Sequence, residues 1–327
     1  MLLTSSTTNL ADGYRTVPVA SLRVDTMLIF DVYIRTAADQ PPVLYRDRNL
    51  VFTSEALARI ADHKHEHIFI PSDQDTAYRK YVEEQLDTIL SDPNVSVAAK
   101  SEVVYSTAQS LVSDVLKEPR SQELLMRSRS LVSATTKFLT AEHTAFQHLL
   151  PLVSYDYYTY THSVNVFVFS MSLAQRVGFT DQKLLEEFGE GALLHDIGKS
   201  QIDPEIVNCR GKLNDEQWKQ MRKHPVYGYD LLSDQDKLGE LALSVVRHHH
   251  EKIRGGGYPD DLLGKKIPPL VRVSTIADIF DALTTRRSYK PALESYKALR
   301  LMQDEMSKDL DPDYFRVFVE MMGNPAG

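Results

Sequence analysis

The sequence has almost no cysteine and no long apolar run. Cys209 is the only cysteine among 327 residues, which excludes an intramolecular disulfide and a cysteine-based zinc site. No stretch approaches the roughly 18 consecutive apolar residues of a membrane-spanning helix, and the polar N-terminal segment lacks the basic and apolar regions of a signal peptide. We therefore expect a cytoplasmic protein that is stabilised by packing or by bound metal.

An excess of positive charge is also missing. The chain has 37 Lys and Arg against 45 Asp and Glu, a formal net charge of −8, which opposes diffuse attraction to nucleic acid or anionic lipid. Any recognition of phosphate must therefore rest on local positive charge. With 43% hydrophobic and 25% charged residues, the chain is an ordinary globular one that is long enough for two domains.

The hydrophobic pattern divides the chain into parts. Residues 1–75 contain short β-type runs at 16–22, 27–34, 42–45 and 67–71 and one helical pattern at 54–63, which predicts a small α+β regulatory or interaction domain. The period then changes to about 3.6 residues, with no further strand predicted. Residues 76–150 are expected to be a helical linker or leading helices, and residues 151–327 an all-α catalytic domain.

Three histidines near the end of the first part alternate along the chain. His63, His65 and His67 would share one face of a strand and could then bind a metal. The stretch looks exposed and supplies no carboxylate partner of its own, which favours a polar entrance to a strand instead.

A second group of histidines carries more information. Six of the eleven histidines fall between residues 162 and 250. His195 and Asp196 are adjacent at the end of an apolar helical run, so two ligands of different chemistry project from one helix end. A carboxylate has two oxygens and can bridge two cations, whereas imidazole supplies one nitrogen to one metal. A lone histidine is usually a core or surface residue, but this clustering indicates metal ligation.

Mixed imidazole and carboxylate ligands suit first-row ions such as Fe, Mn and Zn. Two such ions about 3.5 to 4 Å apart could activate a hydroxide for attack on phosphorus, which predicts a hydrolase. A structural metal is the alternative, but structural zinc sites favour cysteine. The glycine-rich turn at 255–259 follows His249 and His250 closely, so Tyr258 could border the same cleft; a simple surface turn is the other interpretation.

Several motifs follow one another in a characteristic order. They are His195-Asp-Ile-Gly-Lys199, His224-Pro225, His249-His-Glu251, Gly257-Tyr-Pro259 and Ala277-Asp-Ile-Phe-Asp-Ala-Leu283. In these motifs, over about residues 155–312, the sequence resembles the HD-GYP family of cyclic di-GMP phosphodiesterases. The resemblance implies an all-α HD-type helical bundle behind the small α+β domain, and a bacterial signalling enzyme that hydrolyses cyclic di-GMP to pGpG or GMP.

The resemblance also implies the site residues. The implied metal ligands are His162, His195, Asp196, His224, His249, His250 and Asp278. They would hold two divalent ions, foremost Fe or Mn, with Zn or Ni as other candidates. His248 lies outside the matching motif and is expected to be a bystander.

The remaining implied residues act on the substrate. Lys199 resembles the family lysine near the scissile phosphate, where a cation offsets developing negative charge, so Lys199 and Asp196 are the catalytic candidates. Tyr258, Arg287 and Lys290 are the substrate-binding candidates, with a guanidinium fork and a point charge for phosphate. Plain surface charge is the alternative interpretation of Lys199 and of the basic pair.

The sequence departs from the family pattern at three positions. Arg254 stands where the family commonly has Asp, and Ser288 replaces a proline, which affects loop stiffness and substrate preference. Tyr158 lies one helical turn before His162, where some members place a metal-binding Glu. We therefore expect two metals rather than three.

Three functions remain open at this point. The first is cyclic di-GMP hydrolysis, possible partners being GGDEF-domain proteins and a second copy of the chain. The second is a catalytically weak cyclic dinucleotide sensor that signals through the N-terminal domain or a GGDEF partner. The third is hydrolysis of another nucleotide, which the Gly-Tyr-Pro segment disfavours. No nucleic acid polymer and no membrane insertion are expected.

Overall fold

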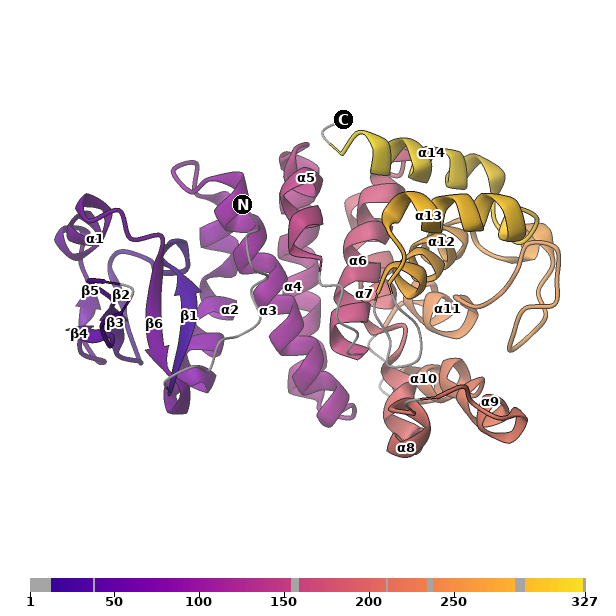
Figure 1. The fold of residues 1–327 in the computed structure, drawn as a ribbon, viewed down its shortest axis with the longest axis horizontal. Coiled ribbons are helices and arrows are strands. Elements are labelled where there is room, and N and C mark those ends of the chain that lie inside the picture. The colour runs from indigo at the N-terminus through magenta and orange to yellow at the C-terminus, as the bar shows by residue number, and fades with distance from the viewer. Residues whose placement is uncertain are drawn as a thin grey trace. The chain divides into compact units, whose positions relative to one another are not determined.

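The structure is a computed structural model that describes residues 13–37, 39–153, 159–209, 211–233, 238–285 and 292–325 (Figure 1). The chain forms two compact units, Met1–Ser110 and Leu111–Gly327. The division falls within one helix, α3 (Val97–Lys117), so the domain limits expected at residues 75 and 150 stay predictions. No helix in the described part of the chain is long and apolar enough to cross a membrane.

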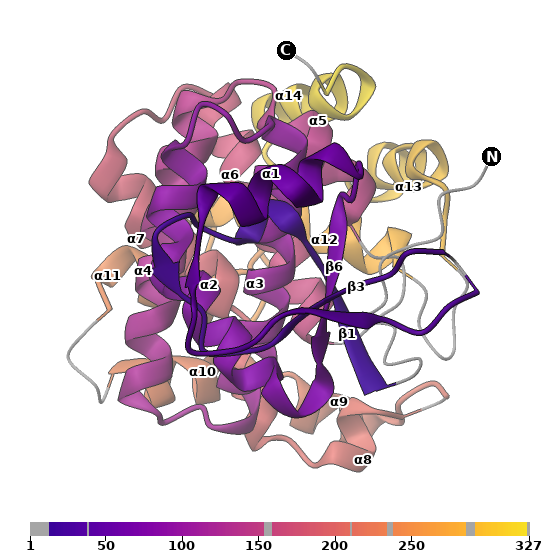
Figure 2. The same cartoon turned by 90° about the vertical axis from the view of Figure 1, so that its left-hand side faces the viewer.

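The first unit contains the strands (Figure 2). A four-stranded antiparallel sheet has the order β1-β6-β3-β4, and a separate pair is formed by β2 and β5. The strands are β1 (Tyr14–Pro18), β2 (Thr26–Met27), β3 (Val32–Ile34), β4 (Val43–Arg46), β5 (Val51–Phe52) and β6 (His67–Pro71). Helices α1 (Ser54–Asp62) and α2 (Asp75–Ser91) complete the predicted α+β composition.

Two strand predictions are wrong in detail. The run at 16–22 is a strand only as far as Pro18, and a 3-10 turn follows at Val19–Ser21. The pattern at residues 27–34 alternates correctly, because Leu28, Phe30 and Val32 are all buried. The backbone nevertheless changes partner within this segment: Leu28 bonds to the carbonyl of Leu50 beside β5, whereas Val32 pairs with Arg46 on β4. The segment is therefore two short strands, since alternation reports burial and not the identity of the paired strand.

The alternating histidines do not form one strand face. His63 is the C-terminal cap of α1, and only His67 lies in a strand. The Nε2 atom of His67 contacts the Glu102 Oε1 atom at 3.1 Å. The polar interpretation of this stretch is thus the appropriate one for the described residues.

The described residues of the second unit form helices joined by loops, without a strand. Its longer helices are α4 (Gln122–Ala141), α6 (Thr159–Arg176), α7 (Gln182–Leu194), α10 (His224–Ser233), α11 (Glu240–His248), α12 (Pro269–Thr284) and α14 (Pro312–Gly323). The shorter ones are α5 (Ala145–Leu149), α8 (Pro204–Val207), α9 (Asp215–Met221) and α13 (Ser295–Leu301). The predicted all-α composition after Asp75 is confirmed for the described residues.

Two of these helices differ from the prediction. The 3.6-residue pattern over 121–150 predicts one continuous helix, whereas the structure ends α4 at Ala141 and begins α5 at Ala145. Helix α14 was not predicted, although Asp311 caps it through the backbone N–H groups of Asp313 and Tyr314, and Pro312 occupies its first position. That pair is a strong N-terminal helix signal.

Helix α6 is the centre of the core. Every residue from 161 to 174 is buried, and its Phe169 ring lies 5.3 Å from Phe280 of α12 and 6.1 Å from Phe318 of α14, between ring centroids. A helix that is buried on all sides can carry a polar residue only where that residue has partners. The buried His162 in the first turn of α6 therefore needs them.

Candidate metal centre

All seven expected metal ligands lie together. His162 is in the first turn of α6, His195 caps α7, and Asp196 follows it directly. His224 begins α10, while His249 and His250 follow the end of α11, and Asp278 is in α12. Six of the seven are at most 5% exposed, and the His250 side chain is 24% exposed. Residues far apart in sequence thus converge because their helix ends meet.

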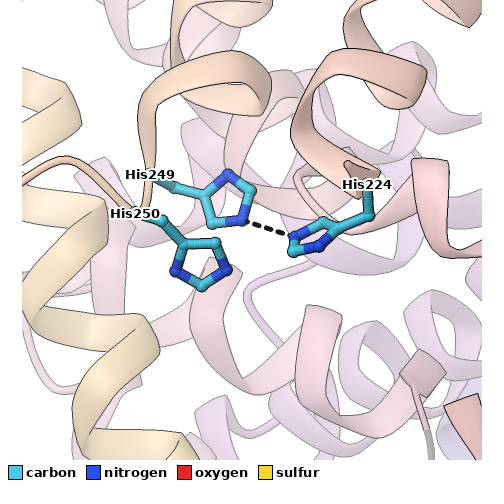
Figure 3. A group of neighbouring side chains, drawn as sticks. All are labelled: His224, His249 and His250. Atoms are coloured by element: carbon cyan, nitrogen blue, oxygen red, sulfur yellow. Dashed lines mark hydrogen bonds between the residues drawn. The ribbon is translucent and has the colours of Figure 1, made fainter. Parts of the chain in front are cut away.

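The ligands form two groups. In the first, the His162 Nε2 atom lies 3.3 Å from His195 Nε2 and 3.4 Å from Asp196 Oδ2. In the second, which Figure 3 shows, the rings of His224, His249 and His250 turn toward one another, with 3.2 Å between the Nε2 atoms of His224 and His249. Within each group the ligand atoms lie within 4.8 Å of one another.

Two carboxylates connect the groups. Asp196 directs Oδ2 toward His162 and holds Oδ1 3.2 Å from His224 Nε2. Asp278 behaves in the same way, with Oδ1 3.2 Å from His162 Nε2 and Oδ2 3.3 Å from His250 Nδ1. The bridging arrangement expected for Asp196 is therefore available to both carboxylates.

The histidine tautomers show that these groups fit a cation. The Nδ1 atoms of His195, His224 and His249 donate to the backbone carbonyls of residues 192, 221 and 246, at 2.8 to 2.9 Å. His162 donates its Nδ1 hydrogen to Asp281 at 2.7 Å. Each neutral ring then keeps a bare lone pair on Nε2. Two such lone pairs face each other in each group, which is unfavourable unless a cation lies beside them.

Electrostatics keeps the ligands in their metal-binding forms. Burial lowers the pKa of His195, lowers that of His249 well below its ordinary value, and lowers that of His250 to about 3. Burial alone would raise the pKa of Asp196, but Lys199 and the neighbouring histidines outweigh it and hold that pKa well below its usual range. Neutral imidazoles and ionised carboxylates are the forms that bind metal.

Asp281 was missed by the sequence analysis. It is fully buried and accepts hydrogen bonds from His162 Nδ1 at 2.7 Å, from Asn165 Nδ2 at 2.8 Å and from Thr285 Oγ1 at 3.0 Å. All three partners are donors, so the ionised carboxylate is well suited to this position. Asp281 lies one helical turn after Asp278, and this spacing in an apolar helix was the available signal.

We expect Asp281→Asn to weaken metal binding roughly 10- to 100-fold, the usual effect of losing a residue that orients a metal-binding histidine. The amide nitrogen of asparagine is a donor and would face another donor in at least one of the three bonds. Competition with a metallochromic chelator measures the affinity. Asp304→Asn is the matched control, because Asp304 is exposed and pairs with Arg300 at 3.4 Å. Equal affinities would contradict the orienting role.

Lys199 lies against the bridging carboxylate. Its Nζ atom is 2.5 Å from Asp196 Oδ2, on the turn η5 (Ile197–Gln201) that follows α7. The lysine therefore lies beside the candidate metal ligands.

The Gly-Tyr-Pro loop is held by Glu251. This buried carboxylate accepts from the backbone N–H groups of Asp260 at 2.8 Å and Leu262 at 3.0 Å. A Cβ atom at Gly257 would lie 2.6 Å from Glu251 Cα, so only glycine fits there. The loop places the Tyr258 ring 4.7 Å from the His250 ring, between centroids. Glu251 had no assigned role in the sequence analysis; the structure makes it the support of this loop.

His248 and Arg254 form ion pairs outside the two ligand groups. His248 lies outside both ligand groups, and its Nε2 atom contacts Asp260 Oδ2 at 2.9 Å. Arg254 pairs with Asp309, as Lys252 does at 3.0 Å, which anchors the segment before the glycines. Four residues lie outside the described part of the chain: Tyr158, Arg287, Ser288 and Lys290.

Comparison with known proteins identifies the family. Residues 147–314 match the HD domain family. A cyclic di-GMP phosphodiesterase of Pseudomonas aeruginosa is 34% identical over 68% of this chain and 53% of its own length. A 3′3′-cGAMP-specific phosphodiesterase of Vibrio cholerae is 35% identical over 48% of this chain and 34% of its own. The chain thus spans about half of the first relative and a third of the second.

A solved structure supports the same assignment at the level of the fold. An HDG"Y"P protein from Bdellovibrio bacteriovorus superposes with a TM-score of 0.66 over 95% of this chain and 100% of its own, at 22% identity. HD domains bind divalent metal ions, and the two ligand groups described above could hold them. The predicted HD-type fold and the HD-GYP resemblance are confirmed, and the chain belongs to the HD domain family.

Proposed function

We propose that the protein is a metal-dependent phosphodiesterase that hydrolyses cyclic di-GMP to pGpG or GMP. The observation that carries this proposal is the pair of histidine groups joined by Asp196 and Asp278, with Lys199 and Tyr258 beside them. The Pseudomonas relative named as a cyclic di-GMP phosphodiesterase supports the choice of substrate.

The ligands would be His162, His195, Asp196, His224, His249, His250 and Asp278, holding two ions, with Fe or Mn foremost. The donors comprise nitrogen and carboxylate oxygen without thiolate, a set that suits these ions. When bound, the ions supply a Lewis acid and an activated water. Asp196 and Asp278 are the carboxylates that face both ligand groups. Two metal-ion positions, one in each group, would therefore use all of the described donor atoms.

The chain's own residues would act around the reacting phosphate. Lys199 offsets the negative charge that develops on the phosphate oxygens and the leaving 3′ oxygen. Burial, followed by the nearby Asp278, raises the pKa of Tyr258, so this phenol keeps its proton and can donate a hydrogen bond to substrate. Arg287 and Lys290 remain proposed phosphate ligands on the strength of the resemblance.

Incubation of the protein, purified without oxygen, with cyclic di-GMP and Mn²⁺ or Fe²⁺ tests the proposal. We expect pGpG or GMP, and we expect Lys199→Ala to lower kcat about 10²- to 10³-fold with unchanged metal content. Lys219→Ala is the control, because Lys219 is an exposed lysine paired with Glu216 at 3.4 Å. Absence of product over hours at micromolar enzyme would refute the activity.

A sensor remains the alternative if substrate is bound but not cleaved. Such a protein would signal through residues 1–75 or through a GGDEF-domain partner, and size-exclusion chromatography would reveal the proposed homodimer in either case. A second candidate substrate is 3′3′-cGAMP, which is favoured by the Vibrio relative's name. Parallel assays of the two cyclic dinucleotides would separate these substrates.

A further inference from the structure

Helix α9 presents two residues that the metal centre does not use. Trp218, the only tryptophan of the chain, is 48% exposed, and Arg222 caps the end of the helix and is exposed as well. The backbone N–H of Arg222 donates to the Trp218 carbonyl at 3.0 Å. The two residues are therefore one turn apart, and their side chains start from the same face.

Arg222 connects this face to the metal centre. Its guanidinium carbon lies 5.1 Å from the centroid of the Tyr258 ring, and Tyr258 in turn lies against His250. Within the described residues Arg222 forms no ion pair with a carboxylate, whereas its neighbour Lys219 is paired with Glu216. His250 and Tyr258 are half-buried, whereas Arg222 and Trp218 on α9 are exposed.

The chemistry of this face matches a guanine base. A guanidinium that stacks on a ring keeps its N–H edge available for a planar, bidentate acceptor. Guanine offers such an acceptor pair in O6 and N7, whereas adenine presents an amino donor in place of O6. An exposed indole is a stacking surface for a base. Arg222 and Trp218 together therefore offer edge recognition and stacking.

We propose that Trp218 and Arg222, with Tyr258, form the subsite for the guanine of the second nucleotide of a cyclic dinucleotide, the one that lies outward from the metal centre. This inference rests on the proposed function, because it assumes that one phosphate of the same substrate lies at the metals. Arg222 then determines specificity for guanine over adenine and takes no part in the bond cleavage itself.

Fluorescence of the single tryptophan tests the subsite directly. Metal-loaded full-length protein is titrated with a phosphorothioate analogue of cyclic di-GMP that resists hydrolysis. We expect saturable quenching of Trp218 emission, because a base stacked on the indole changes its surroundings. The Arg222→Ala variant should need roughly tenfold or more analogue for half-saturation, and Lys219→Ala should behave as the unaltered protein. Emission that stays constant while calorimetry reports binding would overturn the subsite.

Kinetics separates recognition of the base from recognition of phosphate and from support of the loop. Arg222→Ala should raise KM for cyclic di-GMP roughly tenfold with little change in kcat. It should lower the preference for cyclic di-GMP over cyclic di-AMP and leave hydrolysis of bis(p-nitrophenyl) phosphate unchanged. Arg222→Lys, which keeps the charge but loses the fork, should resemble the alanine variant.

Each contrary result has a distinct meaning. If Arg222→Ala lowers kcat/KM equally for cyclic di-GMP and cyclic di-AMP, or if Arg222→Lys restores activity, Arg222 attracts phosphate and does not recognise guanine. Either result would overturn the guanine subsite. If Arg222→Ala hydrolyses bis(p-nitrophenyl) phosphate more slowly as well, Arg222 only supports Tyr258 and its loop. That result would also overturn the guanine subsite. If the unaltered protein neither binds nor hydrolyses cyclic di-GMP, the proposed function itself fails, which is a different outcome from failure of the variant tests.

Discussion

Replacement of Asp196 by asparagine should lower the rate of phosphodiester hydrolysis on the order of 10³-fold or more. It should also reduce the metal content below the two ions per chain that we expect for the unaltered protein. Asparagine keeps the shape of the side chain but exchanges one oxygen for an NH₂ donor. Both oxygens of Asp196 face histidine nitrogens, His162 on one side and His224 on the other. The amide would therefore turn a donor toward one of the two groups.

Metal analysis of anaerobically purified protein and initial rates with added Mn²⁺ measure this effect. Glu320→Gln is the control, because Glu320 is exposed on α14 and pairs with Arg316 at 3.5 Å; exposed pairs of this kind contribute little. Full metal content with an unchanged rate in Asp196→Asn would remove the bridging role. Three ions at full occupancy in the unaltered protein would contradict the two-metal proposal.

Replacement of Gly198 by alanine should destabilise the second unit by about 3 kcal/mol or more. A Cβ atom there would lie 2.0 Å from the His224 carbonyl oxygen and 2.4 Å from the Gly228 nitrogen. Both are backbone atoms, so relief requires η5 and α10 to separate. That separation would also part Asp196 from His224, whose contact is 3.2 Å. Loss of stability and loss of metal should therefore occur together.

Urea unfolding and metal analysis of the same preparations test this expectation. Gly211→Ala is the matched control, because no heavy atom would lie within 4 Å of its new Cβ, and surface changes of this kind usually alter stability by less than about 0.5 kcal/mol. An unfolding midpoint for Gly198→Ala equal to that of the unaltered protein would show that the two segments separate at little cost.

Helices and strands were predictable from the sequence where residues close together in the chain determine them. The 3.6-residue period after Asp75 reflects which side of each helix is buried, and so it located the long helices. The same pattern could not distinguish one strand from two at residues 27–34, because strand partners are set by backbone bonds to Leu50 and Arg46. Helix α14 was missed although its cap and proline were present in the sequence.

The candidate metal ligands were predictable for a different reason. Adjacent polar pairs such as His195 and Asp196 at the end of an apolar helix are unusual in a protein core. Their order along the chain also matches the family to which the chain belongs. The arrangement of these ligands in two groups joined by two carboxylates was not predictable. Each of Asp196 and Asp278 contacts one group through one oxygen and the other group through its second oxygen, and these contacts depend on how the helices pack.

The sequence by itself determined the fold class, the family and the residue types of the metal centre, since these depend on periodicity and on motif order. Only the tertiary structure decided which residues from distant parts of the chain lie against that centre. Asp281 binds His162 across 119 positions of the chain, and Arg222 meets Tyr258 across 36. Such partners are ordinary charged residues in their local context, and they acquire a role only when packing brings two distant helices or loops into contact.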